Sequence, residues 1–155
     1  MPEPASALAG RRADGYIRIE DSGPRGQVTL RGDLGGAEIS RFVKELAGVG
    51  VPGVWQVTRE GDRAAVWMAP DELLLLIPYA EAGQAVARAG EMLEGRHQLA
   101  LDVSDARVVL RLAGPLVGEV LAKGAPCDLS DRAFPPGSAR RTHLGGLAVA
   151  FWRLD

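Results

Sequence analysis

Cysteine is nearly absent from this chain of 155 residues, which contains only Cys127. A single cysteine excludes a disulfide within the chain, so a reducing cytoplasm is the expected location. The polar N-terminal stretch MPEPASALAGRRADG also lacks the apolar core of a signal peptide. We therefore expect a loose leader over residues 1–24 and a single domain over residues 25–155, a length that allows one hydrophobic core.

Long apolar runs and an excess of positive charge are missing as well. The longest apolar run, LLLLIP at residues 73–78, is far shorter than the ~20 residues of a membrane-spanning helix. The formal net charge is −2, and the short basic segments, such as Arg140 and Arg141, are interpreted as solvated surface. Because binding to phosphate backbones needs a cationic excess, neither nucleic acid nor a membrane is an expected partner.

Catalytic and metal-binding motifs are scarce. The two histidines, His97 and His143, have no second ligand at helical spacing, and the sequence contains neither HExxH nor CxxC. Cys127 could act as a nucleophile beside a histidine, but a small half-buried cysteine is the simpler interpretation. We therefore expect no catalytic, cofactor-binding or metal-binding residue in this chain.

Two polar stretches leave a functional alternative open. GDLGGAE, residues 32–38, follows a predicted strand and opens a predicted helix, as a phosphate-binding loop does. It lacks the GxGxxG spacing, and a tight strand–helix turn explains its glycines without a ligand. Asp102 and Asp105 in DVSDAR could form a carboxylate pair for acid–base chemistry. A turn whose side chains cap their own backbone is the plainer explanation of this pair.

What the chain does contain is regular hydrophobic periodicity. A helix with a buried face is predicted by the stripe Ile39, Phe42, Val43, Leu46 and Ala47. Gly48 stands where a helix commonly stops. The other elements predicted in the first half are strands over 27–31, 53–59 and 63–69 and a helix over 81–95.

The leucine run is interpreted as a strand buried on both faces. Pro70 and Asp71 predict a turn before it, and Pro78 ends it, which leaves too few residues for a useful helix. We predict a hairpin in which residues 73–77 pair with residues 63–69. Leucines occupy both alternating faces of this strand, so both faces must be covered.

The second half repeats the order of elements in the first. Its predicted elements are strands over 97–103 and 107–112, a helix over 114–124, and two strands, 138–143 and 147–155, joined by the turn LGG. Val108, Leu110 and Leu112 are expected on the core face. We predict an α+β fold in which a mainly antiparallel sheet and packed helices form two pseudo-repeated halves.

A shared sheet would place the leucine strand at its centre. The counterpart of this strand is missing from the second half, which is expected to be shortened at its C-terminus. The matching slot should then be empty, or be filled by a neighbouring chain or by further residues.

Aromatic residues make up only 5% of the chain, and their positions are informative. Trp55, Trp67 and Trp152 lie on predicted strands, and Phe134 opens the rigid loop FPPG. The hydrophobic core is the default place for such side chains, but large aromatics are also frequent anchors of protein interfaces. We single out Trp67, Phe134 and Trp152 as candidate partner-interface residues.

A combination of short motifs resembles a known family. Residues 102–153 contain D-x-S-x-x-R, L-x-G-P, a short helix ending in LAKG, then DL, FPPG, and TH before an apolar strand. Together with WMAPDELLLL at residues 67–76, they resemble the gamma subunit of heterotetrameric sarcosine oxidase over about residues 53–152. The L-x-G-P, helix and DL part is shared with aminomethyltransferase-like, folate-binding domains.

The resemblance implies an aminomethyltransferase-like fold and a place in a cytoplasmic alpha–beta–gamma–delta complex. Such a complex demethylates sarcosine oxidatively to glycine, forms hydrogen peroxide and passes the one-carbon unit to tetrahydrofolate. FAD, FMN and NAD would be bound by the alpha and beta subunits and zinc by delta. The chain would then be a non-catalytic structural subunit whose partners are alpha, beta and delta, and a homodimer of the isolated chain stays open.

Two other functions remain in competition with that one. The first is a stand-alone folate-binding or one-carbon transfer protein on the related fold, which needs a carboxylate that grips the pterin ring. The second is a general interaction module with other partners. Family members usually continue beyond the FWR strand with a further strand and helix, so partner contacts made by such a tail are not expected of residues 1–155.

Overall fold

A computed structural model of the chain describes residues 4–155, which form three antiparallel sheets and three α-helices. The strands are β1 (Arg12–Asp14), β2 (Arg18–Asp21), β3 (Gly26–Arg31), β4 (Val57–Glu60), β5 (Arg63–Ala69), β6 (Glu72–Ile77), β7 (Leu99–Asp102), β8 (Leu110–Ala113), β9 (Ala139–Leu144) and β10 (Leu147–Trp152). The helices are α1 (Ala37–Ala47), α2 (Ala82–Met92), α3 (Val117–Ala122) and a 3-10 turn η1 (Tyr79–Glu81).

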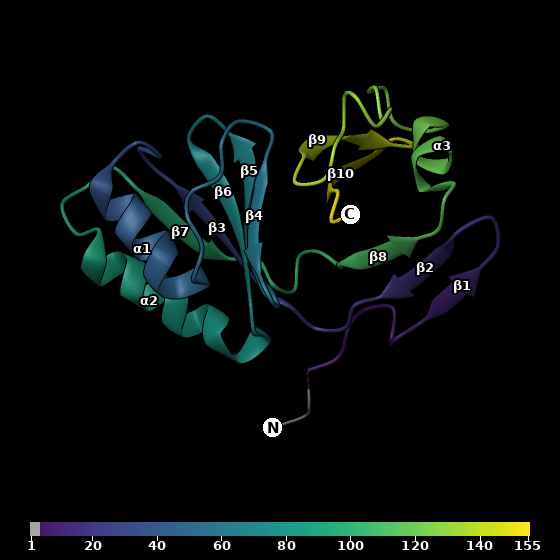
Figure 1. The fold of residues 1–155 in the computed structure, drawn as a ribbon. Helices are drawn as coiled ribbons and strands as arrows, with labels where there is room; N and C mark the ends of the chain where they lie inside the picture. Colours follow the sequence, from purple (N-terminus) through teal and green to yellow (C-terminus); the bar gives the residue numbers. More distant parts are fainter. Residues whose placement is uncertain (1–3) are drawn as a thin grey trace.

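The largest sheet has the strand order β4-β5-β6-β3-β7, and α1 and α2 cover one of its faces (Figure 1). The leucine strand β6 is central and pairs with β5 on one side and with β3 on the other. The predicted hairpin of residues 63–69 with 73–77 is therefore confirmed. The predicted strand at 27–31 and the predicted helix before Gly48 are confirmed as well. Gly48 ends α1 with a left-handed backbone conformation, at a φ of 70°.

The face of the sheet under the helices holds the main core. Val28 and Leu30 of β3 and Leu73, Leu75 and Ile77 of β6 are fully buried there. They pack against the apolar stripe of α1, formed by Ile39, Phe42, Val43 and Ala47, and against Ala82, Ala85 and Ala89 of α2. The helical spacing of the α1 stripe places its buried side chains on one face of the helix, and this face packs on the sheet.

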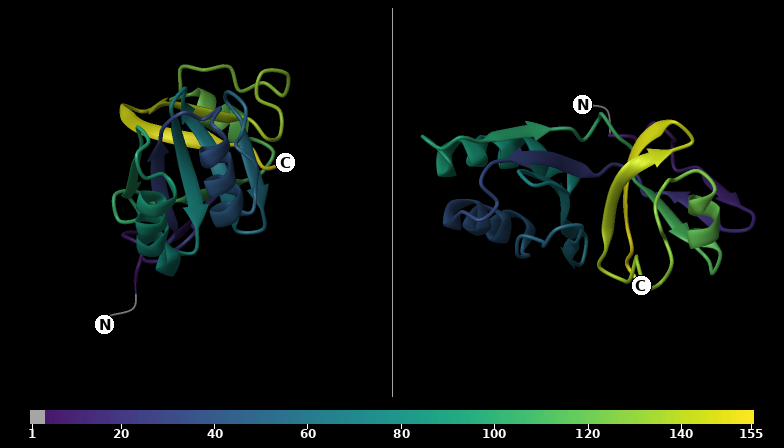
Figure 2. Two further views of the ribbon diagram at one scale, coloured as in Figure 1. Left: turned by 90° about the vertical axis from the view of Figure 1, so that its left-hand side faces the viewer. Right: turned by 90° about the horizontal axis from the view of Figure 1, so that it is seen from above.

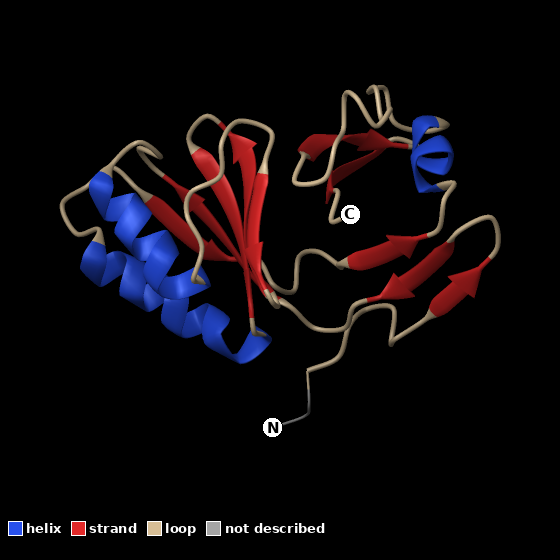
Figure 3. Cartoon of the chain, viewed as in Figure 1, coloured by secondary structure: helices blue, strands red, loops and turns tan. Residues whose placement is uncertain are grey.

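The opposite face of the sheet is covered as well, by the end of the chain. Leu74 and Leu76 of β6 form a second cluster with Val66, Met68 and Ala139, and Trp152 packs against it. Figure 3 shows β9 and β10 on the side of the sheet away from the two long helices. The prediction that the leucine strand is buried on both faces is confirmed.

Three strands of the second half lie in two small sheets: β8 pairs with the N-terminal hairpin in the order β1-β2-β8, and β10 pairs with β9. They share a third cluster beside α3, made of Leu121, Leu129 and Phe134, with Leu112 and Phe151 partly buried against it. Only β7 joins the large sheet, by pairing with β3. Within residues 4–155, β10 pairs only with β9 and β8 pairs only with β2, so the two halves do not share one continuous sheet.

Three details differ from the sequence-based expectations. Residues 12–21, assigned above to a loose leader, form a hairpin whose second strand pairs with β8. Val108 and Leu110, expected in the core, are 43% and 41% exposed, and of the three residues expected on that face only Leu112 packs against a buried cluster, the one beside α3. The strand expected over residues 53–59 begins only at Val57, because Trp55 has a left-handed backbone.

The views from the side and from above show how the parts are arranged (Figure 2). The β9–β10 hairpin crosses beside the large sheet, and the β1–β2 hairpin lies beyond it, away from α1 and α2. Within the described residues, no helix combines the length and apolar character that a membrane crossing requires.

Candidate functional site

The residue types that could do chemistry lie apart or are engaged in structural contacts. Among residues 4–155, no group of three or more His, Cys, Asp and Glu side chains lies close enough together to hold a metal ion. His97 precedes β7 of the large sheet, whereas His143 lies on β9 in the two-stranded sheet. Cys127 lines a surface groove to which no histidine contributes.

The glycine-rich turn at residues 32–38 uses its backbone amides internally. Asp33 accepts hydrogen bonds from the Gly35 amide through its carboxylate at 3.1 Å and from the Gly36 amide through its carbonyl at 2.9 Å. The Gly32 amide bonds the Asp71 carbonyl at 3.0 Å. A Cβ at Gly36 would lie 3.1 Å from the Asp33 carbonyl oxygen. Close packing and local hydrogen bonds therefore account for these glycines without a phosphate.

Asp102 and Asp105 also have structural partners. The Asp102 carboxylate accepts hydrogen bonds from the Ser104 amide and hydroxyl, and the Ser104 hydroxyl in turn accepts one from the Gln27 amide at 2.9 Å. Asp105 accepts one from the Tyr79 hydroxyl at 2.9 Å, which raises the pKa of Tyr79. The two carboxylates thus fasten the turn after β7 to β3 and η1, as the turn interpretation requires.

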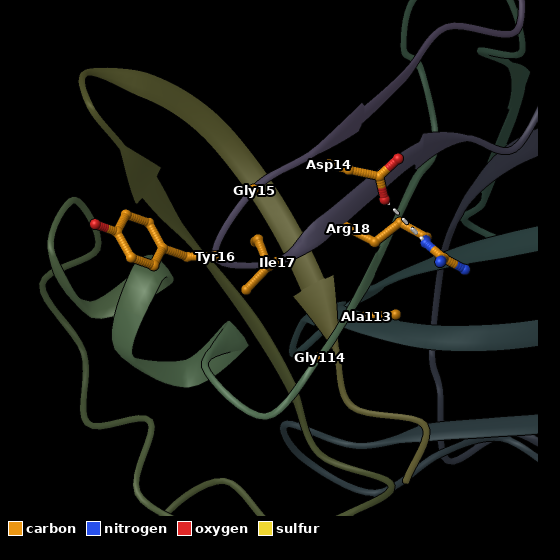
Figure 4. A pocket seen from close by; sticks show the side chains of 7 residues that line it. All are labelled: Asp14, Gly15, Tyr16, Ile17, Arg18, Ala113 and Gly114. Atoms are coloured by element: carbon orange, nitrogen blue, oxygen red, sulfur yellow. Dashed lines mark hydrogen bonds and ion pairs between the residues drawn. The ribbon is translucent and has the colours of Figure 1, made fainter.

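A shallow depression lies at the β1–β2 turn, between the hairpin and the end of β8 (Figure 4). Asp14 pairs there with Arg18 at 3.2 Å, while the side chain of Tyr16 points the opposite way and is 83% exposed. Hydrogen bonding to Arg12 holds the pKa of Asp14 below its ordinary value. Since both charged groups of the depression are exposed and paired with each other, it offers no activated acid or base.

A second depression, which we call the Trp55 groove, is more distinctive. It has a volume of about 370 Å³ and is lined by Trp55, Trp67, Met68, Pro126, Cys127, Arg140, Arg141 and Thr142. These residues come from the loop before β4, from β5, from the loop after α3 and from β9. The groove therefore exists only where the large sheet meets the β9–β10 hairpin.

Arg140 is one of the two arginines that line this groove. Its guanidinium carbon lies 5.1 Å from the ring centre of Trp55 and 5.3 Å from that of Phe134, within the range of cation–π contacts. It also donates hydrogen bonds to the Ala133 and Ala139 carbonyls at 2.6 and 2.8 Å. Arg140 is thus held by aromatic rings and backbone, and no carboxylate of the described residues bonds it directly.

The neighbouring Arg141 belongs to a charged cluster on the sheet face. It lies 3.6 Å from Glu72, whose side chain is only 4% exposed. Arg31 contacts the other oxygen of the same carboxylate at 2.5 and 3.0 Å. One buried negative charge is therefore shared by two half-exposed arginines.

The candidate interface aromatics differ in accessibility. Trp67 is half-buried and lines the Trp55 groove, whereas Trp152 packs against the second core cluster. Phe134 is buried in the third cluster and stacks edge-on against Phe151, with ring centres 5.6 Å apart. Trp55, by contrast, is 57% exposed. Local sequence patterns predicted a strand at Trp55 and solvated surface at Arg140, because no local pattern signals that distant segments converge.

Known proteins match this chain over most of its length. Residues 31–146 match the family described as "Sarcosine oxidase, gamma subunit family". The "Sarcosine oxidase subunit gamma" of an Arthrobacter species is 34% identical over 153 residues, which cover 96% of this chain and 73% of that protein. The chain belongs to the sarcosine oxidase gamma subunit family.

Two further comparisons agree with this assignment. The gamma subunit of Corynebacterium sp. strain P-1 is 33% identical over 152 residues, again 96% of this chain and 73% of that protein. A chain of the solved heterotetrameric sarcosine oxidase from Corynebacterium sp. U-96, in complex with pyrrole 2-carboxylate, has a TM-score of 0.78 at 29% identity. That match covers 93% of this chain and 74% of the other. The resemblance inferred from the motifs is confirmed.

Proposed function

We propose that this chain is a non-catalytic structural subunit of a sarcosine oxidase complex. The observation that carries the proposal is the similarity, over 93% of the chain, to a chain of a heterotetrameric sarcosine oxidase. The complex would demethylate sarcosine oxidatively to glycine, release hydrogen peroxide and transfer the one-carbon unit to tetrahydrofolate. The partners would be the alpha, beta and delta subunits, in the cytoplasm.

The engagement of the chemically interesting residues supports a structural role. Asp102, Asp105 and the glycine-rich turn all have partners that explain them as parts of the fold. FAD, FMN, NAD and zinc would be bound by other subunits. For zinc in particular, residues 4–155 offer no cluster of three suitable ligands.

We further propose a single aminomethyltransferase-like domain with two pseudo-repeated halves. The order β3, α1, β4, β5 in the first half has a counterpart in the order β8, α3, β9, β10 in the second. In the first half, β6 lies between β5 and β3. Among the described residues no strand takes that place between β10 and β8, which fits a slot that a further strand would occupy.

Co-expression with alpha, beta and delta subunits tests the assembly. We expect one complex on size-exclusion chromatography, and a preparation without this chain should lose integrity rather than a single chemical step. If the chain elutes alone while the other three assemble and turn over normally, the proposal is wrong. The same column, loaded with the isolated chain, tells a monomer from a homodimer.

Calorimetry separates this function from the folate-binding alternative. The isolated chain should release no heat of binding when titrated with a reduced folate at high concentration. A saturable binding signal would instead support a stand-alone one-carbon protein.

A further inference from the structure

We propose that the Trp55 groove binds an acidic segment of another subunit, with Trp55 as the apolar anchor and Arg141 as the charge contact. This inference rests on the proposed function, since it names the surface through which the chain would join the complex. The occupant would carry an Asp or Glu side chain next to an apolar one.

The backbone of Trp55 is the first observation behind this assignment. Its φ of 58° lies in the left-handed region, which is unfavourable for a bulky side chain and natural for glycine. The turn itself needs only the backbone, because the Trp55 carbonyl accepts the Ala139 amide at 2.7 Å. Backbone strain in combination with a side chain that stays exposed is typical of a functional position.

The exposure of Trp55 is the second observation. The indole is 57% exposed, so the chain gains little burial energy from a large apolar ring. Arg140 stacks on this ring at 5.1 Å and is itself held by two backbone carbonyls, so the side of the ring toward the groove is fixed. A pre-positioned, exposed tryptophan beside arginine has the composition of an interface hot spot.

The charge of the groove selects an acidic occupant. Arg140 and Arg141 line it, and none of its lining residues is a carboxylate. Glu72 beside Arg141 is already held by Arg31 at 2.5 Å, and Asp128, whose pKa is lowered by the Ser130 amide and hydroxyl and by the charge of Arg140, accepts the Ser130 amide at 2.9 Å. Because Arg31 already holds Glu72, Arg141, which is half-exposed and 3.6 Å from that carboxylate, can bond a further anion.

The shape of the groove favours a protein segment over a small molecule. Its volume of about 370 Å³ suits one or two side chains. Small ligands are usually enclosed over most of their surface, and a wall residue that is 57% exposed cannot enclose one. The aromatic walls Trp55 and Trp67 with Met68 provide the apolar part of the contact, and the arginines provide the polar rim.

Trp55→Gly tests the anchor without harm to the fold. Glycine accepts the φ of 58°, so we expect the melting temperature to stay equal or to rise. The affinity for the assembled alpha, beta and delta subunits should fall about 30-fold or more, as for a hot-spot residue. Tyr16→Ala is the matched control, because Tyr16 is an aromatic residue that is 83% exposed but lies at the other depression. The affinity of this variant for the partner subunits should equal that of the wild type.

Arg141→Gln tests the charge contact. We expect a loss of affinity of about tenfold and a weaker dependence of the affinity on salt concentration. Arg88→Gln on α2 is its control: Arg88 pairs with the exposed Glu45 on the helix side, so its removal should leave the affinity unchanged. If both groove variants bind like the wild type, this inference is wrong while the proposed function stands. A wild-type chain that does not assemble overturns the proposed function itself.

Cys127 offers a second test that needs no variant. It is the single cysteine of the chain and lines the groove. Alkylation of Cys127, followed by mass spectrometry of its peptide, should slow at least tenfold when the alpha, beta and delta subunits are added. An unchanged rate in a complex that has formed would contradict the inference.

Discussion

At the scale of single residues, the buried charge of Glu72 is the most consequential feature. Its carboxylate lies on the non-helical face of the large sheet, 4% exposed, and pairs with Arg31 at 2.5 Å and with Arg141 at 3.6 Å. A buried ion pair adds little net stability, but the loss of one partner leaves a charge that water cannot reach. The cost of removing one partner of Glu72 can be measured as a change in the free energy of unfolding.

Arg31→Leu should lower the free energy of unfolding by about 2 kcal/mol, because it removes the closer partner of a buried carboxylate. Urea unfolding followed by circular dichroism measures this change. The matched control is Arg88→Leu, which breaks the exposed pair with Glu45 and should cost less than about 1 kcal/mol. Equal losses for the two variants would mean that Glu72 is effectively solvated.

At the scale of elements, the leucine strand joins two layers. Leu73, Leu75 and Ile77 face α1 and α2, whereas Leu74 and Leu76 face the β9–β10 hairpin. A strand at the sheet centre with leucines on both faces can be stable only if both layers are present. Substitutions on the Leu74 face of β6 therefore show whether the β9–β10 hairpin packs on the large sheet.

Leu75→Ala and Leu74→Ala should each lower the free energy of unfolding by about 2–5 kcal/mol, since both side chains are buried. Thermal and urea melts of the two variants provide the measurement. Leu101→Ala on the edge strand β7, where the side chain is 47% exposed, is the control and should cost less than about 1 kcal/mol. A harmless Leu74→Ala beside a damaging Leu75→Ala would mean that the hairpin does not cover this face in solution.

At the scale of the whole molecule, the hydrophobic cores are unequal. The core between the large sheet and the long helices contains most of the fully buried large side chains, among them Phe42, Leu30 and Leu93. The cluster beside α3 has only Leu121, Leu129 and Phe134 as buried members, and α3 is six residues long. Regions with few buried contacts open locally at lower free energy.

Amide hydrogen exchange should therefore be slowest in β3, β6 and α1 and clearly faster in β9, β10 and α3. Mass spectrometry of proteolytic fragments over time measures both groups in one experiment. Assembly with the proposed partner subunits should slow exchange near the Trp55 groove, whose β9 wall belongs to the faster group. Uniform exchange across the chain would instead mean that the whole chain unfolds as one cooperative unit.

Local patterns predicted the first half of the fold well. The α1 stripe, its stop at Gly48 and the hairpin after Pro70 all depend on residues close in sequence, and all three are confirmed. The second half was harder, because its alternating residues do not say which face is covered: Val108 and Leu110 have a core pattern but lie exposed. The hairpin at residues 12–21 was missed because its strands are only three and four residues long, too short for a clear periodic pattern.

The sequence by itself determined the family, the mainly antiparallel α+β class and the burial of the leucine strand on both faces. These follow from short motifs and from local periodicity, which need no knowledge of distant neighbours. Only the tertiary structure decided where the Trp55 groove lies, because Trp55, Cys127 and Arg140 come from separate segments. Their meeting depends on how β9 docks beside the large sheet, and no local pattern encodes that contact.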